Sequence, residues 1–297
     1  MDVTILRTYP FPFSFSVGGL TTLTRCSDAA LELDVPEPVA PFSSSADRPD
    51  IDLEVSVKPL AEPSAEGLVC DSGGIWRIHQ TPEGWRLTCP PTWPARLFEL
   101  DRGLAHGHLY CDPRTVRQED GHRAVQALER PGFQILHHWR LAQDGGLVVH
   151  SAGVVHEGRG LLFAGTSGAG KTTISRLWNA HGATVLSDER NCLRPAASGP
   201  TQIYGTPWPS VDGFWCNQQA DLAAIFLIEH APQNALQSIT GAEAAARLYA
   251  FSFVPPFDPL LIAQSLRVVQ RIAGAVPCFR LGFVPDPSVI DCVLRAL

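Results

Sequence analysis

The residues from Gly165 to Thr172, GTSGAGKT, match the pattern GxxxxGK[ST] at every fixed position. An apolar segment, 161–164, precedes them, and a helical pattern, about 171–181, follows. Such a loop directs backbone N–H groups at phosphate oxygens, and the next helix adds the positive end of its dipole. We expect the Lys171 ammonium to reach the β- and γ-phosphates of a nucleotide and the Thr172 hydroxyl to ligate Mg²⁺. The predicted nucleotide-binding residues are Gly165, Thr166, Ser167, Gly168, Ala169, Gly170, Lys171, Thr172 and Thr173.

Two adjacent carboxylates, Asp188 and Glu189, follow the apolar segment 183–187, and Asp188 stands 17 residues after Lys171. This segment is typical of the next buried strand, and in open α/β sheets the carboxyl ends of strands form the ligand crevice. One carboxylate there can hold Mg²⁺, and the other can accept a proton from an attacking hydroxyl. The candidate metal ligands are therefore Thr172, Asp188 and Glu189, with a solvated turn as the alternative interpretation.

A histidine, His150, ends the apolar segment LVVH and stands 15 residues before Gly165. The residues EGRG, 157–160, predict a tight turn, which would place His150 on the strand beside the one that leads into the glycine loop. A histidine in such a strand is either a hydrogen-bonded core residue or an active-site group. The residues alone leave both interpretations open.

Together these features resemble the catalytic core of the HPr serine kinase/phosphorylase family. The resemblance lies in HSAGVVHEGRGLLFAGTSGAGKTT and HGATVLSDER, where Gly182 is the glycine that ends the helix after the loop. It covers these stretches closely and residues 147–297 more loosely. The family is related in fold to phosphoenolpyruvate carboxykinases and forms hexamers, so the resemblance implies that fold and a homo-oligomer.

The resemblance also implies phosphoryl transfer from ATP to a serine hydroxyl. In that case Lys171 and Thr172 hold the phosphates and Mg²⁺, and Asp188 matches the family's base, which also assists metal binding. His150 matches the family's active-site histidine. Glu189 replaces the second aspartate of the family's acidic pair and is one methylene longer, so the match is not complete there.

The stretch YGTPWPSVDGFW, residues 204–215, is a departure from this family. The family carries a Glu-Val-Arg-Gly-Leu-Gly type of signature after the acidic pair, and this sequence lacks it. The form GTPW is similar to a divergent group of related proteins, some of which modify small peptides or free serine. The resemblance therefore implies an acceptor other than HPr. GTPW itself is interpreted either as a loop that closes over a ligand or as a rigid turn.

Patterns along the chain predict two domains, a β-rich domain over residues 1–118 and a P-loop domain over residues 119–297. Alternation over 51–57 and a hairpin from Ile75 to Cys89 indicate strands in the first domain. The expected fold class is α/β (α+β), an HPr-kinase/PEP-carboxykinase-like P-loop domain with a smaller β-rich N-terminal domain.

In the second domain, strands and helices alternate. A helix is predicted over about 122–141, either continuous or broken at Pro131-Gly132, and a strand over 221–229. The residues TGAE, 240–243, predict a capping box at the start of a helix, and Asp258-Pro259 predicts the start of another. A further strand is expected over 276–283, before a short C-terminal helix.

Composition excludes several classes of protein. The net charge is −7 over 297 residues, and no basic cluster is present, so a dedicated nucleic-acid-binding protein is not expected. No run approaches the ~18 apolar residues of a membrane span. The eight cysteines include no CxxC pair and are typical of reduced thiols. We therefore expect a cytoplasmic protein with no membrane contact.

Three further features have weaker interpretations. Arg190, beside the acidic pair, is interpreted as a surface arginine in preference to a phosphate ligand, and Arg280 could sense phosphate. His106, His108 and Cys111 resemble a metal cluster, although no fourth ligand is evident nearby.

The leading hypothesis is an ATP- and Mg²⁺-dependent kinase that acts on a hydroxyl, namely serine of a peptide, a small protein or free serine, with the N-terminal domain recognising the acceptor. A nucleotide-gated regulatory protein without phosphate transfer is one alternative. An ATPase or a carboxykinase-like enzyme is the other.

Overall fold

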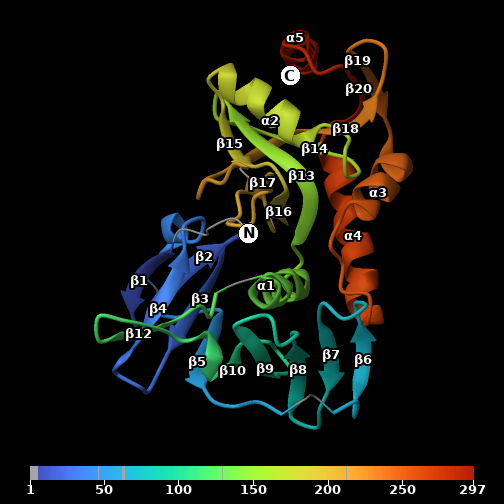
Figure 1. The fold of residues 1–297 in the computed structure, drawn as a ribbon. Coiled ribbons are helices and arrows are strands. Elements are labelled where there is room, and N and C mark those ends of the chain that lie inside the picture. The colour runs from blue at the N-terminus through green and yellow to red at the C-terminus, as the bar shows by residue number, and fades with distance from the viewer. Residues whose placement is uncertain (1–5, 46, 62–63, 129, 212) are drawn as a thin grey trace. The chain divides into compact units, whose positions relative to one another are not determined.

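The structure is a computed structural model that describes residues 6–45, 47–61, 64–128, 130–211 and 213–297. The chain divides into two compact units, Met1–Arg140 and Leu141–Leu297, and each is described by itself. The structure is of the mixed α/β type: the first unit is almost entirely β, and the second combines a large sheet with helices (Figure 1). No helix in the described ranges is both long and apolar enough to cross a membrane.

The first unit contains two sheets. One has the strand order β1-β4-β12-β11, and the other has the order β2-β3-β5-β10-β9-β8-β7-β6. The strands are β1 (Leu6–Pro10), β2 (Phe13–Val17), β3 (Leu20–Arg25), β4 (Leu31–Pro36), β5 (Ile51–Val57), β6 (Leu68–Asp71), β7 (Arg77–Gln80), β8 (Gly84–Thr88), β9 (Ala95–Asp101), β10 (His106–Cys111), β11 (Arg117–Glu119) and β12 (His122–Val125). The predicted hairpin within 75–89 is confirmed, because β7 pairs antiparallel with β8.

The helix predicted over 122–141 is wrong in its first half. Residues 122–125 form β12, which pairs parallel with β4, and helix α1 begins only at Gly132 and ends at Gln143. Pro131 lacks an N–H donor and cannot lie inside a continuous helix, which explains the late start. The pairing of β12 with β4 ties these residues to the first unit, so the two units divide after Arg140 rather than after residue 118.

The second unit is organised around β13 (Leu147–His156). One edge of β13 forms an antiparallel hairpin with β14 (Arg159–Ala164), as the EGRG turn predicts. The other edge pairs antiparallel with both β15 (Thr184–Ser187) and β16 (Arg190–Pro195), which follow each other directly. Since β14 and β15 are each antiparallel to β13, they are parallel to each other and end at the same edge of the sheet.

The remaining strands extend this sheet and close part of it into a ring. They are β17 (Thr201–Tyr204), β18 (Gln219–His230), β19 (Ala235–Ile239) and β20 (Cys278–Phe283). Because β14 pairs with β18 as well as with β13, the pairings β13–β14–β18–β17–β16 return to β13. The sheet is thus mixed, and an antiparallel strand separates the two strands that lead to the predicted site.

The helices of this unit pack in two groups, which can be followed in Figure 1. The helices are α2 (Lys171–Ala180), α3 (Gly241–Ala250), α4 (Pro259–Ala275) and α5 (Ser288–Leu294). Apolar residues of α2 and α5 share one buried cluster with Phe163 and Phe226, and those of α3 and α4 share another with Leu162 and Leu227. Successive strand residues therefore alternate between two cores, as expected for a sheet covered on both faces.

Two predicted helix starts have different outcomes. The Asp258 carboxylate accepts the Leu260 N–H at 2.9 Å, so the cap of α4 is confirmed. Thr240 precedes α3 but forms no side-chain cap, so the predicted capping box is wrong. The Glu243 carboxylate bonds to arginines instead, which leaves it unavailable to the Thr240 backbone.

Candidate active site

The glycine loop, residues 165–170, connects the end of β14 to the start of α2. Gly168 and Gly170 have φ values of 81° and 107°, in the left-handed region that favours glycine. A Cβ at Gly170 would also lie 2.5 Å from a ring carbon of Phe283. Both the backbone conformation and this close contact therefore disfavour a side chain at position 170. Thr166, Ser167 and Gly168 are exposed and form the accessible part of the loop.

Lys171 is the first residue of α2, and its side chain is folded back across the glycine loop. Its Nζ donates to the carbonyl oxygens of Gly165 at 3.1 Å and of Thr166 at 3.0 Å. Burial lowers the pKa of this amine, while the nearby Glu189 and Asp188 act in the opposite direction. An anionic phosphate would be a stronger partner for this buried ammonium than two neutral carbonyls are.

Asp188 lies between β15 and β16, and its side chain is completely buried. Its Oδ2 accepts the Thr172 hydroxyl at 3.1 Å and also the Ser210 hydroxyl. Its Oδ1 accepts the backbone N–H groups of Ser210 and Phe214, both at 3.2 Å. The structure thus brings together Thr172 and Asp188, two residues that the sequence analysis placed at one edge of the sheet.

Glu189, next along the chain, has different neighbours. Its Oε1 lies 3.4 Å from His150 Nε2 and 3.4 Å from Arg190 Nη1. The hydrogen bond from His150 is the main cause that lowers the pKa of Glu189, and burial opposes it. His150 therefore contacts the second residue of the acidic pair, not the first.

Arg190 is 18% exposed at its side chain, so its interpretation as a surface arginine is wrong. Its guanidinium carbon lies 5.0 Å from the centre of the Phe253 ring, in a cation–π contact. Strand β16 directs the side chain inward beside His150, with which Arg190 is in register on β13. This inward orientation depends on a strand pairing that the local sequence does not specify.

The segment 205–218 supplies the contacts to Asp188 that the sequence analysis missed. The Thr206 hydroxyl donates to the Arg190 carbonyl at 2.7 Å, and Trp208 is buried. The backbone at Gly205 approaches Cys216 so closely that a Cβ would lie 2.0 Å from the Cys216 oxygen. Both observations favour the rigid-turn interpretation of GTPW. The only available signal for Ser210 was its place in the stretch that replaces the missing signature; its neighbour Asp212 lies outside the described residues.

The other predicted candidates are not brought to this site. Arg280 pairs with Glu243 at 2.6 Å and with Glu229 at 3.6 Å. On β10, Cys111 is buried while His106 and His108 are exposed. No group of three or more His, Cys, Asp and Glu residues within the described ranges could hold a metal ion. This finding argues against a metal site at the histidine–cysteine candidate. It does not bear on Mg²⁺, which needs only one or two carboxylates beside phosphate oxygens.

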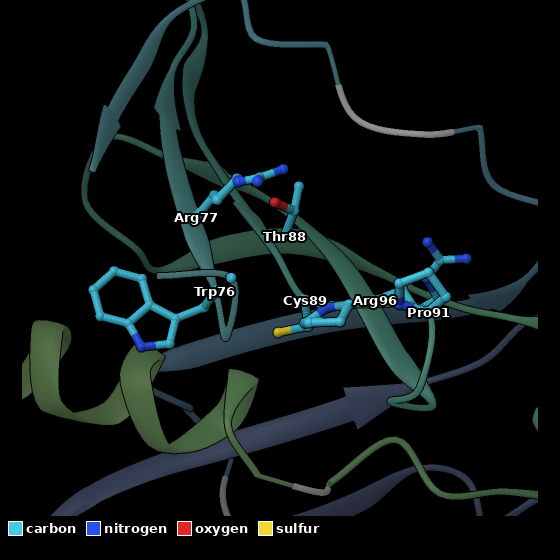
Figure 2. A pocket seen from close by; sticks show the side chains of 8 residues that line it. Trp76, Arg77, Thr88, Cys89, Pro91 and Arg96 are labelled. Atoms are coloured by element: carbon cyan, nitrogen blue, oxygen red, sulfur yellow. The ribbon is translucent and has the colours of Figure 1, made fainter. Parts of the chain in front are cut away.

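A separate cavity of about 210 Å³ lies in the first unit, at the ends of β7, β8 and β9 (Figure 2). Arg77 and Thr88 stand side by side on paired strands. Arg77 is bonded to Asp71 at 2.7 Å and Arg96 to Asp112 at 3.2 Å, so carboxylates compensate both guanidinium charges. Burial raises the pKa of the Cys89 thiol to about 12, which keeps this thiol protonated and unreactive at neutral pH.

The comparisons with known proteins match parts of the chain. The sequence model of the family described as SynChlorMet cassette protein ScmC matches residues 129–255, less than half of the chain but the whole of the site around Asp188. A search of curated proteins finds none that matches. Among solved structures, an Hpr(Ser) kinase/phosphatase from Coxiella burnetii matches with a TM-score of 0.30 and 12% identity, over 50% of this chain and 94% of that one.

Proposed function

We propose that this protein is a kinase that uses ATP and Mg²⁺ and transfers the γ-phosphate to a hydroxyl group. The hydrogen bond between Thr172 and Asp188 carries the proposal, because it joins the first turn of the helix after the glycine loop to a buried carboxylate. Thr172, which follows the phosphate-binding Lys171, is therefore in direct contact with Asp188, which can take a proton. Phosphoryl transfer requires both groups within contact of the same phosphate.

In this proposal the glycine loop and Lys171 bind the phosphates. The exposed backbone of residues 166–168 offers N–H groups, and the N-terminus of α2 adds its dipole. The buried Lys171 ammonium neutralises the phosphate charge that builds up during transfer. These residues bind and orient the donor but do not select the acceptor.

The residues at the loop fit a magnesium ion. The Thr172 hydroxyl and the Asp188 carboxylate supply hard oxygen ligands, which Mg²⁺ prefers, and phosphate oxygens and water complete such sites. When bound, the ion neutralises charge on the β- and γ-phosphates. Asp188 would take the proton of the acceptor hydroxyl. The oxygen of that hydroxyl would bond to the γ-phosphorus while the bond from this phosphorus to ADP breaks and ADP leaves. The exposed loop surface is consistent with an acceptor such as a serine-bearing peptide or free serine.

Transfer of labelled phosphate tests the proposal. The full chain is incubated with Mg²⁺ and ATP labelled in the γ-phosphate, together with serine-bearing peptides or free serine, and products are identified by mass spectrometry. We expect transfer that Asp188→Asn lowers by at least about 10³-fold, because the amide neither accepts a proton nor balances Mg²⁺ charge. Asp291→Asn, at an exposed position on α5, is the matched control and retains transfer.

Two results would contradict the proposal. Tight ATP binding with no transfer to any acceptor would point to a nucleotide-gated regulatory protein. Phosphate release at the same rate with and without acceptor would point to an ATPase. Retention of full transfer in Asp188→Asn would remove Asp188 from the role of base, even if the chain is a kinase.

A further inference from the structure

Ser210 occupies the position against Asp188 that the hydroxyl of an acceptor would need. Its side-chain hydroxyl bonds to Asp188 Oδ2, the same oxygen that accepts the Thr172 hydroxyl at 3.1 Å. Thr172 in turn lies in the first turn of the helix that follows the glycine loop. A hydroxyl of this chain is therefore already hydrogen-bonded to the proposed base, on the side of the carboxylate that faces the phosphate-binding residues.

The segment that carries Ser210 is fixed at both ends around Asp188. The Gly205 N–H donates to the Gln218 carbonyl at 3.0 Å, and the Cys216 N–H donates to the Leu186 carbonyl at 2.8 Å. Between these anchors the segment folds tightly, with the Gly213 N–H donating to the Ser210 carbonyl at 3.1 Å. Ser210 thus lies in an anchored turn rather than at a free tip.

Gly213 shows how close this approach is. A Cβ at Gly213 would lie 2.3 Å from Asp188 Oδ1 and 2.7 Å from Ser210 Oγ, so any side chain there would separate the two. The contact between Ser210 and Asp188 therefore depends on the absence of a side chain at position 213.

The Ser210 hydroxyl is not needed to hold Asp188 in place. The backbone N–H groups of Ser210 and Phe214 already bond to Oδ1, and Thr172 bonds to Oδ2. An alanine at position 210 would keep these three bonds. What the hydroxyl adds is a nucleophilic oxygen whose proton already points to a carboxylate.

We propose that Ser210 is a site of self-phosphorylation, in which the chain transfers phosphate from ATP to its own hydroxyl. The inference rests on the proposed kinase function. Ser210 Oγ forms a bond to the γ-phosphorus, the bond from that phosphorus to the β,γ-bridging oxygen breaks, ADP leaves, and the Ser210 proton passes to Asp188. Because Ser210 is only partly buried and the next residue, Val211, is 73% exposed, the new phosphate has access to water.

The test uses the full chain with Mg²⁺ and γ-labelled ATP and no added acceptor. We expect incorporation that approaches about one phosphate per chain, located on Ser210 by peptide mass spectrometry. Ser210→Ala should lower incorporation by at least about tenfold, and Ser210→Thr should restore part of it, because threonine keeps the hydroxyl. Ser198→Ala, at an exposed serine on the loop between β16 and β17, is the matched control and should incorporate normally.

Dilution separates an intramolecular step from transfer between chains. The first-order rate constant should stay unchanged over about a tenfold dilution, because the hydroxyl and the base belong to one chain. A first-order rate constant that falls in proportion to chain concentration would overturn the assignment.

Failure of this inference can be told apart from failure of the proposed function by a second measurement, the binding of ATP by calorimetry. ATP binding together with label on another residue, such as Ser167, overturns Ser210 as the site. ATP binding with transfer to an external acceptor and no label on the chain overturns self-phosphorylation. Both results leave the kinase in place. Absence of ATP binding overturns both.

Discussion

Two groups of carboxylates in the second unit are neutralised in opposite ways. Glu229 and Glu243 are 40% and 43% exposed and bond to the guanidinium groups of Arg247 and Arg280. Asp188 is completely buried, and its hydrogen-bond partners are two hydroxyls and two backbone N–H groups. The first group balances its charge internally, whereas the four donors to Asp188 carry no formal charge.

This difference indicates which group is built for a ligand. A buried carboxylate is costly unless it is well hydrogen-bonded, and hydroxyl donors can exchange for a metal ion or for an acceptor hydroxyl. Carboxylates that are paired with guanidinium groups have no hydroxyl donor that a ligand could replace. Partly exposed ion pairs contribute little beyond local stability. The difference supports the proposed catalytic role of Asp188 and a structural role for the ion-pair group of Glu229, Glu243, Arg247 and Arg280.

The largest effect is expected from Lys171→Met. The variant should lose at least about 10²-fold in ATP affinity, because a buried ammonium contact to phosphate is removed. Its stability should be equal or higher, since burial disfavours the charged amine. The wild-type chain should gain stability as pH rises from the lowered pKa of Lys171 toward 10.5, and the variant should lack that gain.

Calorimetry with ATP and Mg²⁺, together with thermal unfolding, measures both quantities. Arg176→Met, a change on the same helix that removes an exposed cation, is the matched control. If Lys171→Met binds ATP as the wild type does, the loop is not the phosphate site, and the comparison fails.

Thr172→Val should have the next largest effect, with Thr240→Val as its control. Valine keeps the shape of threonine but removes one ligand for Mg²⁺ and one donor to Asp188. We expect the Mg²⁺ concentration needed for half-maximal ATP binding to rise by about tenfold. Thr240 is exposed, lies outside the glycine loop and forms no side-chain cap, so its variant should respond to Mg²⁺ normally. Equal responses of the two variants would contradict a metal role for Thr172.

Sequence reasoning found the parts of this site that depend on local patterns. The loop, Lys171 and Thr172 follow from one motif, and the position of Asp188 follows from the end of the next strand. The reasoning assumed a doubly wound sheet, but the parallel strands β14 and β15 lie on either side of the antiparallel β13. The two arrangements bring the same strand ends to one edge, which is why the expected proximity of Thr172 and Asp188 holds.

What sequence reasoning missed depends on pairings between distant segments. Residues 122–125 form a strand because they pair with β4, some ninety positions earlier, and with β11 across the turn at Asp120-Gly121. Ser210 reaches Asp188 because the segment 205–218 is anchored to Leu186 and to itself. The contact of Ser210 leaves no periodic pattern or motif in the local sequence. The strand at 122–125 did have a local signal, the Asp120-Gly121 turn, which the helix prediction did not use.

Arg280→Gln tests the other half of the comparison and should have a modest effect. The variant removes the ion pairs of Arg280 with Glu229 and Glu243, but Arg247 still bonds to both carboxylates. A loss of less than about 1 kcal/mol in stability is expected, because these side chains are partly exposed. ATP affinity should stay within about twofold, since the binding machinery is untouched. A tenfold or greater loss of affinity, on the order of 1.4 kcal/mol, would show instead that Arg280 contacts phosphate.

The smallest effect is expected from Glu189→Gln, and it should depend on pH. The hydrogen bond from His150 lowers the pKa of Glu189 below its ordinary value of 4.5 in the folded chain. Such a carboxylate contributes stability that is fully present above pH 4.5 and is lost as pH falls through the lowered pKa. The variant should therefore be less stable by about 0.5 kcal/mol near neutral pH. The difference should shrink on acidification.

Thermal unfolding between neutral and acidic pH measures this difference, with Glu157→Gln as the control at a side chain that is 72% exposed. The control should follow the wild type at every pH. A constant difference between Glu189→Gln and the wild type would mean that the glutamine disturbs packing rather than the hydrogen bond with His150. An accompanying loss of phosphate transfer would indicate that Glu189 takes part in the reaction together with Asp188.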